Sequence, residues 1–162
     1  MLKKLNLFRR LLILSIYLLS SFTINAQNIW QDVSGSSIIS SNERYIIPAN
    51  YKTYALDFET LLNYLGNAPK EFSVNIYNGG LPLSLPMPDG QMHQFSIVES
   101  SLMPNNLAVK FPDIKSYVGQ GLDDKSATLR MSVDHNGFHA MIISKSGTVY
   151  IDPYSLNDTE YY

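Results

Sequence analysis

The stretch that decides the fold is TLRMSVDHNGFHAMIISKSGTVYI, residues 128–151. Polar and apolar residues alternate over 128–133, and 138–143 and 148–151 are two further short runs with apolar and β-branched residues, as is typical of β-strands. The segments between the runs, 134–137 and 144–147, both end in glycine and are typical of hairpin loops. The stretch therefore predicts three consecutive antiparallel strands.

One segment upstream has helical spacing instead. Asp57 is a good N-cap, Gly66 stands where a C′ glycine belongs, and Pro69 blocks continuation. A helix of about eight residues is too short to be stable alone, so its apolar face must dock on a sheet. The residues of that face are Phe58, Leu61, Leu62 and Leu65.

The remaining apolar runs are short and recur about every ten residues, which favours an all-β arrangement. We expect a mainly β (α+β) fold, an antiparallel β-sandwich or half-barrel with one short docked helix. Pro82 limits one of the strands to a sheet edge, and Pro88-Asp89-Gly90 predicts a turn. The other expected strands are residues 45–48, 51–56, 72–76, 81–85, 95–99, 107–111 and 114–118.

The composition limits the possible functions. The chain has 162 residues, of which 45% are hydrophobic and 16% charged, enough apolar residues for one packed domain. It contains no cysteine, which excludes disulfides, thiolate zinc sites and cysteine nucleophiles. The net charge of −2 argues against a nucleic-acid partner.

The N-terminus predicts export. Lys3, Lys4, Arg9 and Arg10 precede an apolar run at 11–19, and small Ala26 follows a more polar segment. This three-part pattern indicates a signal peptide over 1–26, cleaved between Ala26 and Gln27. The apolar run falls well short of the roughly 20 residues of a spanning helix, so we expect a periplasmic or extracellular protein without a stable membrane anchor.

Cleavage would change the charge. Removing four basic residues leaves 8 basic against 14 acidic residues, a net charge of −6. Within the mature chain we expect a flexible leader at 27–44, rich in Ser, Asn and Gln, and a β domain at 45–158.

The residues show no assembled catalytic motif. H-E-x-x-H, G-x-S-x-G and phosphate-binding glycine loops are all missing from the sequence. His135 and His139 are four residues apart, but a strand and turn would not bring them onto one metal. Asp123 and Asp124 could hold a cation, although a solvated loop explains them as well. We therefore expect no enzyme, no cofactor and no metal site in this chain.

A family resemblance adds a function. From residue 45 to about 158 the chain resembles the N-terminal propeptide of secreted bacterial reprolysin-like (metzincin) zinc metalloproteases. The similar stretches, in order, are YKTYALD (51–57), APKEF (68–72), LPMPDG (85–90), FSIVES (95–100), FPDIKSY (111–117), GQGLDD (119–124), GFHAMI (137–142) and YIDPY (150–154). Ser101 departs from the pattern, since the family is expected to have proline there.

The resemblance implies a non-catalytic prodomain that covers the protease cleft and assists folding of the catalytic domain, in cis or in trans. The zinc motif of that domain is missing here, so the chain is either a fragment or a free-standing prodomain-like protein. Residues 159–162 would then begin a linker to the catalytic domain, which alone would hold zinc.

Latency could involve the metal. Without cysteine, a carboxylate is the available zinc cap, and Asp89 at an exposed turn is the candidate. A plain turn aspartate is the alternative for Asp89, and His93 is a second possible cap. The alternative function is an independent exported β-domain that binds a surface polysaccharide or protein through its tyrosines.

Overall fold

The computed structural model describes residues 29–34, 38, 42–44 and 46–162. The predicted signal peptide, with its junction between Ala26 and Gln27, lies outside these residues.

Six strands form one antiparallel sheet in which every strand pairs with its neighbour in sequence. This confirms the expected half-barrel of mainly β structure, and the three strands and two hairpin loops of residues 128–151 are where the sequence predicts them. The strands are β3 (Leu81–Pro86), β4 (Met92–Glu99), β5 (Lys115–Gly121), β6 (Thr128–Asp134), β7 (Gly137–Ser144) and β8 (Gly147–Ile151).

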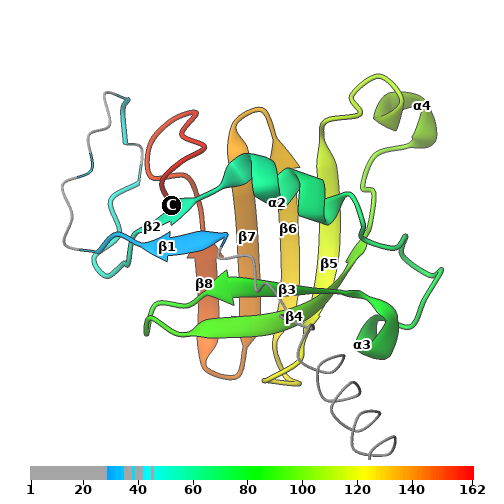
Figure 1. Cartoon of the computed structure of the whole chain (residues 1–162), viewed down its shortest axis with the longest axis horizontal. Coiled ribbons are helices and arrows are strands. Elements are labelled where there is room, and N and C mark those ends of the chain that lie inside the picture. The colour runs from blue at the N-terminus through cyan, green and yellow to red at the C-terminus, as the bar shows by residue number, and fades with distance from the viewer. Residues whose placement is uncertain (1–28, 35–37, 39–41, 45) are drawn as a thin grey trace, which may run out of the picture.

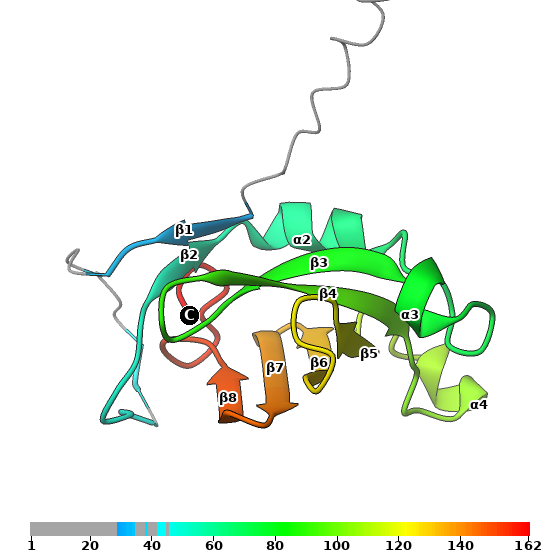
Figure 2. The same cartoon turned by 90° about the horizontal axis from the view of Figure 1, so that it is seen from below.

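The sheet curls strongly, so that β3 and β4 pass across β5–β8 and enclose the core between them (Figures 1 and 2). Gly119, in the middle of β5, leaves room for the side chains of the neighbouring strands to pack closely over it. A Cβ atom there would lie 2.9 Å from Leu129 Cδ2 and 3.1 Å from Ile97 Cγ2, distances at which packed carbon atoms collide. The inward residues of the strands alternate with outward ones, as the period of two requires.

The helix α2 (Phe58–Leu65) closes one side of the core and confirms the predicted helix. Asp57 caps it by accepting a hydrogen bond of 2.9 Å from the Thr60 backbone N–H. The Thr60 hydrogen bonds hold the pKa of the Asp57 carboxyl below its ordinary value. Leu61 and Leu65 are buried, and Leu62 is half-buried against the same core.

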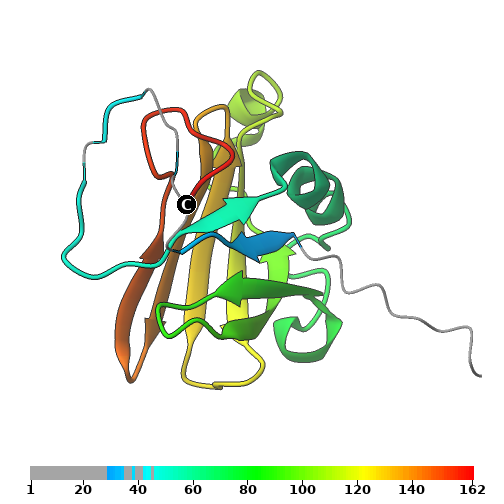
Figure 3. The same ribbon diagram turned by 60° about the vertical axis from the view of Figure 1, so that its left-hand side comes forward.

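A second, two-stranded sheet lies beside α2 and pairs β1 (Trp30–Asp32) with β2 (Tyr54–Leu56) (Figure 3). The prediction of a flexible leader at 27–44 is wrong for Trp30, which is only 4% exposed and belongs to the core. Burial of its indole explains why this part of a polar segment is ordered. The expected strand at 51–56 shrinks to β2, and residues 46–48 are not in a strand.

Two predicted strands are short helices instead. In place of a strand at 72–76, Phe72 lies in a turn with φ of 66°, and α3 (Ile76–Gly79) starts where the Asn75 side chain caps Tyr77 N–H. In place of a strand at 107–111, α4 (Asn105–Ala108) begins after Pro104, whose carbonyl accepts from Ala108 N–H. Capping by the Asn75 side chain outweighs the strand-like pattern in the first segment, whereas α4 starts after Pro104 without a side-chain cap.

Residues 159–162 do not form the predicted linker, because they are part of the fold. Tyr162 exchanges two backbone hydrogen bonds of 2.9 Å with Tyr54, and Leu56 N–H donates to Glu160. The Tyr162 side chain is 7% exposed. Its ring packs edge-on against Trp30 and Phe138, with centroid distances of 5.6 and 6.1 Å.

Candidate functional site

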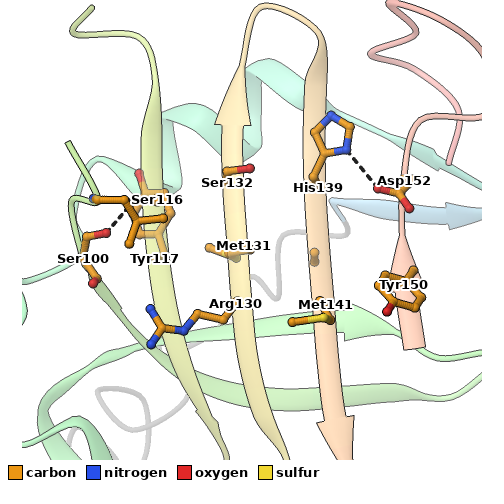
Figure 4. A pocket seen from close by; sticks show the side chains of 12 residues that line it. Ser100, Ser116, Tyr117, Arg130, Met131, Ser132, His139, Met141, Tyr150 and Asp152 are labelled. Atoms are coloured by element: carbon orange, nitrogen blue, oxygen red, sulfur yellow. Dashed lines mark hydrogen bonds and ion pairs between the residues drawn. The ribbon is translucent and has the colours of Figure 1, made fainter. Parts of the chain in front are cut away.

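The face of β5–β8 turned away from α2 is open and carries two rows of side chains that cross the strands. The strand register sets Ser116, Ser132 and His139 side by side, and Asp152 follows directly after β8. The second row is Val118, Arg130, Met141 and Tyr150. Leu102 and the residues of these rows, apart from Val118, line a shallow groove of about 250 Å³ (Figure 4).

His139 and Asp152 form an ion pair at one end of the groove. The His139 Nδ1 atom lies 2.9 Å from Asp152 Oδ1, and both side chains are partly exposed. The hydrogen bond that Asp152 accepts from the imidazole raises the pKa of His139 above its ordinary value of 6.5, against a smaller opposing effect of burial. The pair therefore joins β7 to the segment after β8 most strongly when the imidazole is protonated.

This linkage predicts a dependence of stability on pH. A raised folded-state pKa stabilises the protein below the unfolded pKa of 6.5, and the contribution is lost as pH rises through the folded value. Because both groups are exposed to solvent, we expect the loss to be below about 1 kcal/mol. Urea unfolding of wild type and Asp152→Asn at pH 5.5–8.5 would measure it. The difference in unfolding free energy between the two proteins should shrink as pH rises, and a constant difference would contradict the pairing.

Arg130 occupies the centre of the open face. It is exposed, and its guanidinium has no ion pair or hydrogen bond among the described residues. Met141 and the 65%-exposed ring of Tyr150 follow it across β7 and β8. A row that contains a cation, a thioether and an exposed aromatic ring can bind an anionic group that carries an apolar or sugar-like surface.

Ser132 stands opposite His139, and with Asp152 the three residue types of a hydrolase triad share one row. In such triads the serine hydroxyl is hydrogen-bonded to the imidazole, and no such bond joins Ser132 and His139. Ser116 is engaged elsewhere, because its hydroxyl donates to Ser100 O at 2.6 Å. The first row therefore combines a histidine held by aspartate with two serine hydroxyls that are not bonded to it.

Asp89 lies at the tip of the β3–β4 hairpin and is exposed, as its turn predicted. Its Oδ1 accepts from Gln91 N–H at 2.9 Å. The Lys52 ammonium lies beside the tip, 2.6 Å from where a Cβ of Gly90 would be, and pairs with Asp32 at 3.3 Å. Asp89 is thus an accessible carboxylate next to a basic group.

The other predicted candidates are not brought together. Asp123 accepts from Gln94 N–H at 2.7 Å and so ties the β5–β6 loop to β4, while Asp124 accepts from Ser126 within the loop. His135 is exposed in the β6–β7 turn, and His93 lies on β4. Within the described ranges, no three His, Asp or Glu side chains are grouped to hold a metal ion.

Sequence reasoning missed a group of exposed apolar side chains in the segments around α3 and α4, at the end of the molecule opposite the β3–β4 hairpin tip (Figures 1 and 2). We call it the apolar end. Phe72 is 93% exposed, Val109 80% and Leu102 77%. Backbone hydrogen bonds hold the segments that carry Phe72 and Leu102 at the same end of β4. They run from Glu71 N–H to Glu99 O and from Ser100 N–H to Ser116 O. The exposed residues of the apolar end are Phe72, Tyr77, Leu102, Leu107, Val109 and Phe111.

None of the helices in the described part of the chain is both long and apolar enough to cross a membrane.

No protein-family model, no curated protein and no solved structure matches this chain.

Proposed function

We propose that the chain is the non-catalytic prodomain of a secreted zinc metalloprotease, exported with its signal peptide and binding the catalytic domain in cis or in trans. It holds the protease latent and assists its folding. Zinc belongs to the catalytic domain, and this chain contributes a folded surface.

The ordered resemblance carries the proposal, and its stretches coincide with defined elements of the fold. YKTYALD runs through β2 to the cap of α2, and LPMPDG and FSIVES belong to the β3–β4 hairpin. FPDIKSY leads from the apolar end into β5. A prodomain needs such a rigid scaffold with a surface that another domain covers.

The apolar end is the surface best suited to that contact. Side chains as exposed as Phe72 and Val109 gain stability when a partner removes them from water. Lys70 and Glu99 lie next to these residues and form an ion pair with each other. A partner that docks there would therefore not bury either charge without its counterion. Binding of a standard interface would cover roughly 1,200–2,000 Å².

The zinc-capping role of Asp89 is a separate part of the proposal. Figures 1 and 2 place the β3–β4 hairpin tip and the helices α3 and α4 at opposite ends of the molecule. A catalytic domain docked only on the apolar end would therefore not present its zinc to Asp89. The two contacts can be tested independently.

The test uses the inactive catalytic domain of the metzincin encoded downstream of, or nearest to, this reading frame. Binding by calorimetry should weaken at least about tenfold in Val109→Asp, because a carboxylate would be buried without a partner. Ile47→Asp is the matched control, since Ile47 is 73% exposed but lies in the segment before β2, and it should bind like wild type.

Asp89→Ala tests the second contact. If Asp89 caps zinc, this variant should lose much of the inhibition while keeping the unfolding free energy within about 0.5 kcal/mol of wild type. Inhibition equal to wild type would remove the capping role and leave steric occlusion. Failure of every variant and of wild type to bind the catalytic domain would reject the prodomain proposal.

The alternative is an independent exported domain that binds a surface polysaccharide or protein. The exposed ring of Tyr150, in one row with Arg130 on the open face, favours it, because aromatic rings and cations bind acidic sugars well. Binding of an oligogalacturonate that is abolished in Tyr150→Ala, without binding to any metzincin domain, would support this alternative.

A further inference from the structure

The two edges of the six-stranded sheet differ in their capacity to pair. Hydrogen bonds from Leu122 N–H to Gln94 O and from Ser100 N–H to Ser116 O direct the even-numbered residues of β4 toward β5. Because such pairs alternate, the backbone groups of Pro82, Ser84 and Pro86 point outward from β3. Two of these three residues have no N–H, and the Pro82 carbonyl accepts from the Tyr64 hydroxyl. The β3 edge is therefore protected.

The same alternation of hydrogen-bonded pairs shows which backbone groups of β8 point away from the sheet. The hydrogen bond from Gly121 N–H to Ala127 O shows that the odd-numbered residues of β5 and β6 bond to each other. The registers of β6–β7 and β7–β8 then determine which residues of β7 and β8 are hydrogen-bonded. Val149 and Ile151 then bond to β7, whereas the N–H and C=O groups of Thr148 and Tyr150 point away from the sheet. These groups have no hydrogen-bond partner in the described part of the chain.

Nothing in β8 blocks pairing of this edge. Its five residues, Gly147–Ile151, contain no proline and no charge and are rich in β-branched and aromatic types. Figure 3 shows β8 at one margin of the six-stranded sheet, where the strand order ends. Natural proteins usually protect an edge of this kind or cover it.

We propose that β8 pairs with β8 of a second copy of this chain, joining two six-stranded sheets into one. An antiparallel pairing about a two-fold axis at Val149 sets Thr148 opposite Tyr150 of the second copy, and Tyr150 opposite its Thr148. Both outward-pointing groups of each residue are then satisfied, which gives four backbone hydrogen bonds.

The edge is complementary to itself in charge as well as in register. The pairing brings Lys145, in the β7–β8 turn, toward Asp152 of the second copy, and no like charges lie opposite each other within the strand. It also covers part of Tyr150, which is 65% exposed. This inference does not depend on the proposed function, because it concerns the β8 edge of the sheet and requires no protease.

The test is the mass of the purified protein by light scattering over about 1 µM to about 1 mM, because a short strand pair gives a weak dimer. We expect the mass to double with concentration. Tyr150→Pro removes one outward N–H without touching the β7 ladder, and Val149 before it is already extended, so the variant should stay monomeric about tenfold beyond the wild-type midpoint.

Ser84→Pro is the matched control, because it removes the outward N–H of the other edge and should leave the dimer intact. If Tyr150→Pro fails to fold, Thr148→Lys is the second test, because it places a charge on the pairing edge. It should also raise the concentration of half-dimerisation at least about tenfold. A wild-type mass that stays monomeric over the whole range would overturn the inference. So would dimers that persist unchanged in folded Tyr150→Pro or Thr148→Lys.

Discussion

Tyr162→Ala should lower the free energy of unfolding by about 3–5 kcal/mol, as expected for a large aromatic residue removed from a core. The ring fills a space between Trp30 and Phe138. Its hydroxyl also accepts a hydrogen bond of 2.9 Å from the Phe138 N–H, which the substitution would leave unpaired and buried. Burial raises the pKa of Tyr162, so the hydroxyl stays neutral.

Two variants separate these contributions in chemical unfolding. Tyr162→Phe keeps the ring and loses only the acceptor, so we expect a cost of about 1–3 kcal/mol. Tyr161→Ala changes the half-buried neighbour and should cost clearly less than Tyr162→Ala. If Tyr162→Ala were as stable as wild type, the terminal residues would not be part of the folded domain.

Leu61→Ala should cost about 2–5 kcal/mol, because the side chain is fully buried between α2 and the sheet and its removal leaves a cavity. The eight-residue helix adds little stability of its own, so its docking decides whether it forms. Leu62→Ala should cost less, since Leu62 is only half-buried.

Glu59→Ala is the control on the same helix, because Glu59 is exposed and surface changes usually stay within about 0.5 kcal/mol. Thermal and urea unfolding should rank the three variants as Leu61, Leu62 and Glu59, from most to least destabilised. A loss below about 0.5 kcal/mol for Leu61→Ala would mean that α2 is not docked.

The parts of the fold that the sequence predicts correctly have strong local signals. The strands β6–β8 combine alternation with glycine-containing loops, and α2 combines a cap, an apolar face and a stop. The failures have weak local signals and depend on distant contacts. Trp30 is ordered by Phe138 and Tyr162, more than 100 residues away.

Part of the open face could have been predicted from the sequence. The loop closed by Ser144 and Gly147 fixes the β7–β8 register, and counting back from it places His139 opposite Asp152. The alternation also puts Arg130 and Tyr150 on the outward face. The apolar end was harder to find, because α4 replaces the predicted strand and leaves Val109 exposed.

Inhibition of a metzincin catalytic domain tests the prodomain proposal most directly. The active domain, produced without this chain, would be titrated with the purified protein while cleavage of a fluorogenic peptide is followed. The proposal predicts that peptide cleavage falls with saturation at one prodomain per catalytic domain, and that Val109→Asp shifts the titration to higher concentration while Ile47→Asp does not. Full protease activity at the highest concentration of a demonstrably folded domain would contradict it.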